Sequence, residues 1–133
     1  MSKKRGFTLV ELMVVILIVS ILAAVAVPIM RGRIDAAKWS EGKAMAGTLA
    51  TSIRAYGAEK GSAGTYGATS LPSLTSLGFN ASDLTGTYFA SGDYSWTSAW
   101  DATAQAPTFT ISVTTTALTP GTVTLDNAGN WTP

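Results

Sequence analysis

The sequence predicts an α+β protein in which one long N-terminal helix packs against a small antiparallel sheet. Three observations lead to this prediction. Residues 12–30 are uncharged and almost entirely apolar, a helical stripe of apolar side chains follows between residues 45 and 56, and apolar and hydroxyl-bearing residues alternate after residue 86. An uncharged run of this length indicates a helix that can cross a membrane, and the alternation indicates half-buried strands.

The apolar run begins directly after an acidic residue, Glu11, and Ser20 is its one polar side chain. A carboxylate inside hydrocarbon costs on the order of 2.5–3.5 kcal/mol, so we expect Glu11 to have a function and a partner. The expected membrane-spanning half of the helix comprises residues 7–30, and an amphipathic half comprises residues 31–60.

The N-terminal sequence, MSKKRG followed by FTLVELMVVILIVSILAAVAVP, resembles that of type IV pilins and pilin-like proteins, including the pseudopilins of type II secretion systems. The resemblance is close over about the first 34 residues and extends to the rest as a general layout. It implies the pilin fold, a leader (residues 1–6) that a prepilin peptidase removes between Gly6 and Phe7, and N-methylation of the new Phe7 amine. The leader residues Lys3, Lys4 and Arg5 are expected to stay in the cytoplasm, as the positive-inside rule predicts independently.

Two other interpretations of the same residues remain open. A secretory signal peptide is compatible with the basic start, the apolar run and the small residues at positions 24–26, and would give a mature chain beginning at Val27. Against it, Glu11 weakens the apolar region, and hydrophobic sequence continues past residue 26. A plain single-pass anchor explains the length of the run but neither the Gly6-Phe7 junction nor Glu11.

Cleavage would supply Glu11 with a partner. The new amino group on Phe7 lies four residues upstream, about one helical turn away on the same face. The resemblance implies that the Glu11 carboxylate pairs with the N-terminal amine of a neighbouring subunit and so sets the axial register of the apolar helices in a filament. Such a pair adds little net stability but penalises wrong registers. The spacing alone allows the pair to form within one chain or between chains.

The amphipathic half is predicted from four apolar residues at spacings of four, four and three, namely Met45, Leu49, Ile53 and Tyr56. A helix from residue 7 to about residue 60 would be about 80 Å long, so half of it would project from a membrane.

Two residues near the join between the halves are expected to interrupt this helix. Pro28 removes a helical hydrogen bond and its ring clashes with the preceding turn, and Gly32 follows it closely. We therefore expect a kink at Pro28 and Gly32. The resemblance implies that the helix loosens around such a proline on assembly, whereas the residues alone are equally compatible with a permanent kink.

Residues 61–86 are expected to form a connecting segment rich in Gly, Ser and Thr, which the resemblance identifies as the variable αβ-loop. Leu71, Leu74 and Leu77, with Pro72 near their start and Gly78 after them, predict a short helix or turn.

Residues 87–133 are expected to form the antiparallel sheet and the C-terminal region. The alternating apolar residues are Tyr94 and Trp96, then Phe109, Ile111 and Val113, then Val123 and Leu125. The Ser and Thr residues between them predict a solvent-facing side. Turns are predicted at residues 119–121 and 126–129.

The composition excludes several kinds of site. The chain has no Cys and no His, so disulfides, thiol nucleophiles and imidazole metal ligation are not available, and neither is the Cys-closed C-terminal loop of many type IV pilins. Removing the three basic leader residues leaves six basic against eight acidic side chains, so no nucleic-acid surface is predicted. In the oxygen-rich stretch at residues 126–130, Asp126 is the one carboxylate, which favours a plain turn over a calcium site. No cofactor or metal is predicted.

Together these features predict a non-enzymatic structural subunit of a type IV pilus or pilus-like filament. The expected partners are further copies of the chain, a prepilin peptidase and methyltransferase, an inner-membrane assembly platform, and the membrane before assembly. The precursor is expected in the bacterial inner membrane, crossing it once with the leader in the cytoplasm, and the product in an extracellular pilus or a periplasmic pseudopilus. The alternatives are a pseudopilin of a type II secretion system and a minor pilin for DNA uptake or adhesion.

Overall fold

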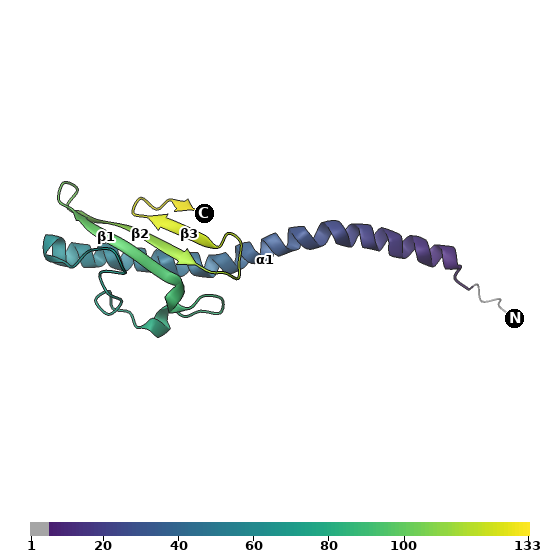
Figure 1. The fold of residues 1–133 in the computed structure, drawn as a ribbon, viewed down its shortest axis with the longest axis horizontal. Coiled ribbons are helices and arrows are strands. Elements are labelled where there is room, and N and C mark those ends of the chain that lie inside the picture. The colour runs from purple at the N-terminus through teal and green to yellow at the C-terminus, as the bar shows by residue number, and fades with distance from the viewer. Residues whose placement is uncertain (1–5) are drawn as a thin grey trace. The chain divides into compact units, whose positions relative to one another are not determined.

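The computed structural model describes residues 6–133, and the expected leader residues Lys3, Lys4 and Arg5 lie outside the described residues. One helix is followed by a connecting segment and then by a sheet (Figure 1). The elements are α1 (Leu9–Lys60), the short 3-10 helices η1 (Gly61–Ala63), η2 (Ala81–Leu84) and η3 (Ser91–Asp93), and the strands β1 (Tyr94–Asp101), β2 (Ala106–Thr114), β3 (Thr122–Asp126) and β4 (Trp131–Thr132).

The chain divides after Ala36 into two compact units, and α1 contributes to both. The first unit contains the apolar half of the helix. The second unit, Ala37–Pro133, contains the rest of α1, the connecting segment and the sheet. The predicted fold class, a long helix with a small antiparallel sheet, is confirmed.

The four strands form one antiparallel meander in the order β1-β2-β3-β4 (Figure 1). Val113 in β2 is paired with Tyr94 on one side and with Val123 on the other, so the alternating apolar positions share one face of the sheet. That face is buried through Tyr94, Trp96, Phe109, Ile111, Val113, Val123 and Leu125. The opposite face carries the predicted hydroxyl-bearing side chains, which are exposed or half-buried.

One face of α1 packs against this core. Leu49 and Ile53 of the predicted stripe are completely buried, whereas Met45 and Tyr56 lie at its edge. The remaining buried positions of the helix are Trp39, Gly42, Ala46, Ala50 and Gly57. Most of these are small residues, which an apolar pattern does not reveal, and they let the helix backbone approach its neighbours closely.

Two glycines mark the closest approaches of the helix. A Cβ atom on Gly57 would lie 2.6 Å from Cδ of Pro107 in β2, and one on Gly42 would lie 2.9 Å from Cζ of Phe89. Non-bonded carbon atoms pack at about 3.5–4.0 Å. Both positions therefore need glycine for packing rather than for backbone conformation.

The connecting segment covers the outer edge of β1. The Ser70 backbone N–H donates to the Trp96 carbonyl oxygen at 2.8 Å, and the Ser98 N–H donates to the Gly67 carbonyl oxygen at 2.9 Å. The Trp96 indole N–H donates to the Pro72 carbonyl oxygen at 3.1 Å. These bonds satisfy backbone groups that a bare edge strand would leave unpaired.

The short helix or turn predicted around Leu74 and Leu77 is a turn. The Phe79 N–H donates to the Leu74 carbonyl oxygen at 2.9 Å, and Gly78 adopts a φ of +83°, which glycine tolerates and other residues rarely adopt. The sheet was expected within residues 87–133, and its first strand begins at Tyr94. The described residues 87–93 form no strand and include η3.

A carboxylate on α1 fixes the last part of the connecting segment. Oε1 of Glu41 accepts hydrogen bonds from the backbone N–H groups of Tyr88 at 2.9 Å and Phe89 at 3.3 Å. Gly86 passes so close that a Cβ atom on it would collide with the same carboxylate. Nζ of Lys38 lies 5.3 Å from the centroid of the Tyr88 ring, a cation–π contact. Two charged side chains of the helix therefore hold residues 86–89 in place.

Replacing Gly57 with alanine is expected to destabilise the protein by about 1–3 kcal/mol, because the added methyl group would collide with the Pro107 ring. In the control Gly47→Ala, on the same helix, the added Cβ would meet nothing within 4 Å, so a gain of up to about 1 kcal/mol is expected. Denaturant unfolding of the full chain in detergent, followed by circular dichroism, measures both changes. Equal effects of the two substitutions would contradict the close approach.

The Tyr94 hydroxyl is buried and has no hydrogen-bond partner among the described residues. Burial, with a smaller contribution from the negative charges of Glu41 and Asp93, raises the pKa of Tyr94 to about 12. The unfolded chain ionises this group near pH 10. The stabilising contribution of the neutral Tyr94 is therefore complete below about pH 10 and is lost as the pH rises towards 12.

Replacing Tyr94 with phenylalanine is expected to remove this loss, which amounts to about 2–3 kcal/mol between pH 10 and pH 12. At neutral pH the variant should be as stable as the wild type or more so, because the hydroxyl has no partner to lose. Tyr56→Phe is the control: it loses the hydrogen bond that its hydroxyl oxygen accepts from the Thr65 N–H at 3.0 Å and should cost about 1 kcal/mol at neutral pH. Unfolding free energies measured for both variants and the wild type across this pH range test the prediction. If the unfolding free energy of Tyr94→Phe fell between pH 10 and pH 12 as steeply as that of the wild type, the role of Tyr94 would be refuted.

Candidate functional site

The predicted processing junction lies ahead of the helix. Gly6 and Phe7 are exposed residues outside regular secondary structure, and Phe7 keeps 82% of its surface in solvent. An added Cβ on Gly6 would meet nothing within 4 Å. The peptide bond between these residues is therefore accessible to a protease without any unfolding of α1.

Glu11 forms a capping box with Thr8 at the start of α1. Oε2 of Glu11 accepts hydrogen bonds from the Thr8 backbone N–H at 2.9 Å and the Thr8 hydroxyl at 2.8 Å, and the Glu11 N–H donates to Oγ1 of Thr8 at 3.2 Å. The box satisfies backbone N–H groups that the first helical turn leaves unpaired, and it places negative charge at the positive end of the helix dipole. Thr8 was not among the predicted site residues, although Thr and Glu three residues apart are the sequence signature of this box.

The capping box engages one carboxylate oxygen of Glu11. Both bonds from Thr8 go to Oε2, and Oε1 has no hydrogen-bond partner among the described residues. In the uncleaved chain the Phe7 nitrogen is an uncharged amide, so the predicted ion pair with a Phe7 amine would require cleavage between Gly6 and Phe7. The geometry leaves Oε1 of Glu11 for that amine without any loss of the helix cap.

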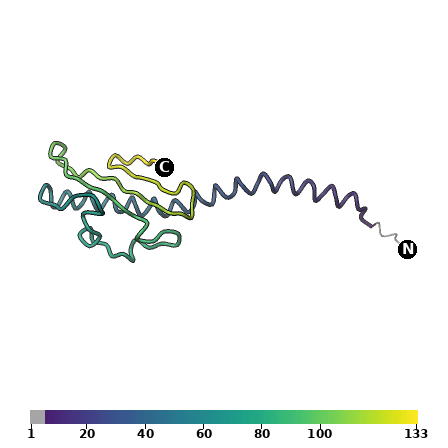
Figure 2. The backbone as a smooth tube through the Cα atoms, in the orientation of Figure 1, coloured from purple at the N-terminus to yellow at the C-terminus, as the bar shows by residue number. Residues whose placement is uncertain are grey.

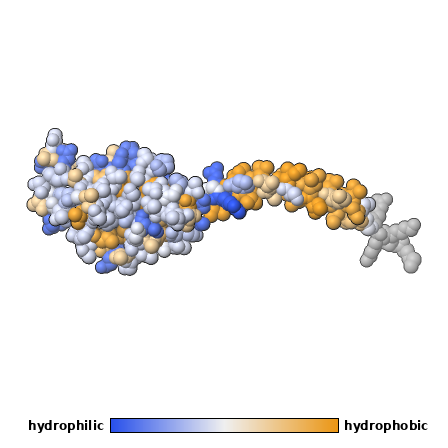
Figure 3. All heavy atoms as spheres, in the orientation of Figure 1, coloured by the Kyte–Doolittle hydropathy of each residue, from blue (hydrophilic) through white to orange (hydrophobic). Residues whose placement is uncertain are grey.

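The surface that follows Glu11 is apolar on all sides. The large hydrophobic side chains between Leu12 and Met30 keep about half or more of their surface in solvent. The Ser20 hydroxyl donates to the Ile16 carbonyl oxygen at 2.6 Å, so this polar group is satisfied within the helix. Figure 3 shows the N-terminal half of α1 as a nearly continuous hydrophobic surface. By length and composition this helix can cross a membrane.

Pro28 and Gly32 both lie within α1, and helical structure continues through them (Figure 2). Proline has no N–H to donate to the carbonyl group four residues earlier, so the helix is locally weakened at this point. Around Gly32 an added Cβ would meet nothing within 4 Å, so no packing contact holds this position. The kink stays a prediction.

The oxygen-rich stretch after β3 is a turn. Oδ1 of Asp126 accepts a hydrogen bond from the Asn130 N–H at 2.8 Å, and Oδ2 accepts one from the Asn130 side-chain amide at 2.9 Å. These two bonds hold the pKa of Asp126 below its usual value. Gly129 adopts a φ of +91°, as the reversal requires. Within residues 6–133, His, Cys, Asp and Glu side chains do not gather in groups of three or more that could hold a metal ion.

Comparisons with known proteins gave one family match and two similar proteins. Residues 1–27 match the family described as the prokaryotic N-terminal methylation motif. The chain is similar to a fimbrial protein of Moraxella nonliquefaciens, with 49% identity over 53 residues, or 40% of this chain and 34% of the relative. It is also similar to the fimbrial protein EcpC of Eikenella corrodens, with 40% identity over 58 residues, or 44% of this chain and 38% of the relative. The chain thus spans little more than a third of the curated relatives it matches, and no solved structure matches it.

Proposed function

We propose, on the premise that this chain belongs to the type IV pilin family, that it is a structural subunit of a type IV pilus or pilus-like filament and has no enzymatic activity. The observation that carries the proposal is the apolar half of α1, exposed on every side and headed by the carboxylate of Glu11. A helix of this kind needs surroundings as apolar as itself. The membrane provides them before assembly, and the same helices of neighbouring subunits provide them afterwards.

Processing is proposed to occur at the accessible junction ahead of the helix. A prepilin peptidase cuts between Gly6 and Phe7, the Phe7 amine is methylated, and the basic leader stays on the cytoplasmic side of the inner membrane. The match of residues 1–27 to the methylation motif supports this assignment. The subunit then crosses the membrane once, and residues 37–133 lie on the outer side until an assembly platform takes up the subunit.

Assembly is proposed to depend on Glu11 and on the amine of Phe7. Oε1 of Glu11 accepts the amine of a neighbouring subunit while Oε2 keeps the helix cap with Thr8. This pairing occurs at a single axial register, because any other register leaves a carboxylate and an ammonium group unpaired in an apolar environment. Pro28 and Gly32 are proposed as the place where α1 bends or loosens as the helices come together.

A filament exposed on the cell surface is preferred to a periplasmic pseudopilus because the two relatives described above are fimbrial proteins. Deletion of the gene should remove surface fibres visible by electron microscopy. Loss of protein secretion without any loss of fibres would indicate a pseudopilin instead.

The mass of the mature protein is the most direct test of processing. A chain that begins at Phe7 and carries one extra methyl group is expected, and intact-protein mass spectrometry of purified membranes or filaments measures it. A chain that begins at Val27 would show that the N-terminal segment is a cleaved signal peptide, and the proposal would fail. A chain that retains residues 1–6 would indicate a plain membrane anchor.

Replacing Glu11 with alanine is expected to leave cleavage intact and to reduce filament yield by at least about tenfold, because a buried ammonium group would lose its partner. Thr8→Ala is the matched control. It removes the two bonds of the Thr8 hydroxyl, at about 1 kcal/mol of local helix stability, but keeps the Glu11 carboxylate and should still assemble. Filament counts by electron microscopy and sheared-fibre yields measure both variants. Equal losses would assign the role of Glu11 to the helix cap rather than to docking.

A further inference from the structure

A cation and an aromatic ring lie together at the first turns of the part of α1 that belongs to residues 37–133. Within this unit, all of which is described, Tyr88 is the one large hydrophobic side chain that remains exposed, with 51% of its surface in solvent. Lys38 lies 5.3 Å from the centroid of its ring. Tyrosine is one of the residue types that are enriched at protein interfaces, and it often contributes strongly to binding.

The backbone that carries the Tyr88 ring is fixed by contacts within the same subunit. The Glu41 carboxylate binds the backbone N–H groups of Tyr88 and Phe89, and Gly86 leaves room for that carboxylate. The adjacent Phe89 is buried and packs against Trp39 with the two rings tilted and their centroids 5.1 Å apart. Because its backbone is already fixed on both sides, Tyr88 would lose little conformational freedom on binding.

At the opposite end of the same helix segment, the carboxylate of Glu59 accepts no hydrogen bond from a described backbone N–H group. In residues 37–133, five acidic side chains accept hydrogen bonds from backbone N–H groups: Glu41, Asp83, Asp93, Asp101 and Asp126. Glu59 is the exception, because its one partner among the described residues is the neighbouring Lys60, at 2.6 Å. The Glu59 and Lys60 side chains are 68% and 50% exposed, and exposed pairs of this kind contribute about 0–1 kcal/mol. The carboxylate of Glu59 can therefore take a second cation.

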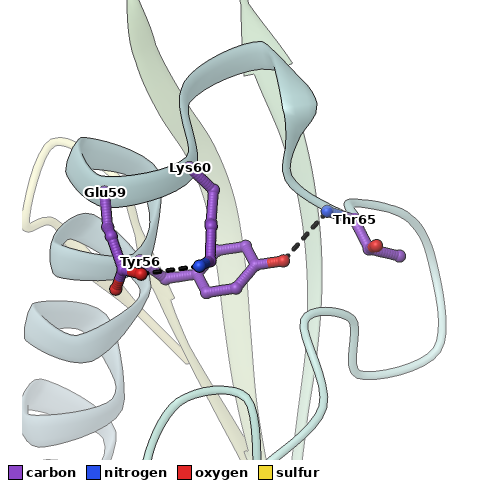
Figure 4. Close-up of polar contacts among 4 residues, drawn as sticks. All are labelled: Tyr56, Glu59, Lys60 and Thr65. Carbon is purple, nitrogen blue, oxygen red and sulfur yellow. Dashed lines mark hydrogen bonds and ion pairs between the residues drawn. The ribbon is translucent and has the colours of Figure 1, made fainter.

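Glu59 borders an open hollow of about 290 Å³ between α1 and the turn at residues 76–78. Tyr56, Ala55 and Leu77 contribute to its walls. Figure 4 shows Tyr56, Glu59 and Lys60 side by side, and the Thr65 N–H donates a hydrogen bond to the Tyr56 hydroxyl oxygen. A cavity of about 150 Å³ suffices for a benzene molecule, so the hollow has room for a tyrosine ring.

We propose that Lys38 and Tyr88 of one subunit bind the hollow beside Glu59 of the next copy of this chain. Lys38 pairs with Glu59, and the Tyr88 ring enters the hollow near Tyr56 and Leu77. This contact rests on the proposed function as a filament subunit and names the surface through which its folded domains meet.

The two surfaces have the geometry that a filament requires. They are different from each other, and they lie about 30 Å apart along α1, since 21 residues separate Lys38 from Glu59 at 1.5 Å each. A contact between two different surfaces of identical subunits repeats from copy to copy and produces an open helical polymer, unless it closes into a ring.

A charge exchange tests the pairing in the full chain, expressed with its assembly apparatus. Lys38→Glu and Glu59→Lys are each expected to reduce filament yield by about tenfold, because each places like charges together. The double variant Lys38→Glu/Glu59→Lys is expected to recover wild-type yield to within about twofold. Lys43→Glu is the control for net charge: Lys43 lies over the partly buried Trp131 ring, at 5.4 Å, and should assemble normally.

Cross-linking gives an independent readout, because the natural chain has no cysteine. Thr87→Cys and Ser76→Cys introduced together are expected to yield a ladder of disulfide-linked chains from oxidised filaments, whereas either change alone should give no ladder. Normal filaments from both single charge reversals, or filaments of the double cysteine variant without a ladder, would overturn this contact and leave the proposed function standing. An absence of filaments from the wild-type chain itself would overturn both.

Discussion

The structure depends on one constraint: half of its helix is apolar on every side and cannot remain in water. Seventeen large hydrophobic side chains between Phe7 and Met30 are exposed, and covering them is worth on the order of tens of kcal/mol. A small folded domain is stable by only about 5–15 kcal/mol, so no rearrangement of residues 37–133 could offset that cost. The chain must therefore always have an apolar surrounding, and its folded domain is the part that faces water.

Carboxylates of the folded domain stabilise its turns and 3-10 helices by accepting hydrogen bonds from nearby backbone N–H groups. Asp83, Asp93 and Asp101 each accept N–H groups at the start of a 3-10 helix or within a turn, and Asp126 holds the reversal after β3. A chain without cysteine cannot fix such loops covalently. Carboxylates that accept hydrogen bonds locally perform this role in a domain with few charged residues.

The parts of the fold that sequence predicted well are those in which periodicity determines burial. The alternation in β2 and β3 identified the buried face without error, because in a half-buried sheet each side chain has one of two environments. The N-terminal helix was equally clear, whereas the amine partner expected for Glu11 stays a prediction.

The parts that sequence did not predict are set by contacts between distant residues. Gly42 and Gly57 lie on the buried face of α1, where they leave room for the side chains of Phe89 and Pro107. These contacts join residues that are far apart in the sequence, so no local pattern reveals them. The path of the connecting segment is likewise determined by its bonds to Trp96 and Ser98, which no local pattern encodes. The capping role of Thr8 differs, because the sequence itself contains the capping-box signature, a Thr followed three residues later by Glu11.

The covering of the β1 edge by the connecting segment has a consequence for any polymer of this chain. Copies packed side by side meet at very high effective concentration, and a bare strand edge there invites pairing of backbones across subunits, as in amyloid. Here residues 67–71 occupy one edge of the sheet, and β4 on the other edge is two residues long. Both features disfavour backbone pairing between neighbouring copies at the edges of the sheet. In the proposed filament, subunits that meet without continuous backbone ladders would separate more easily than subunits joined by such ladders.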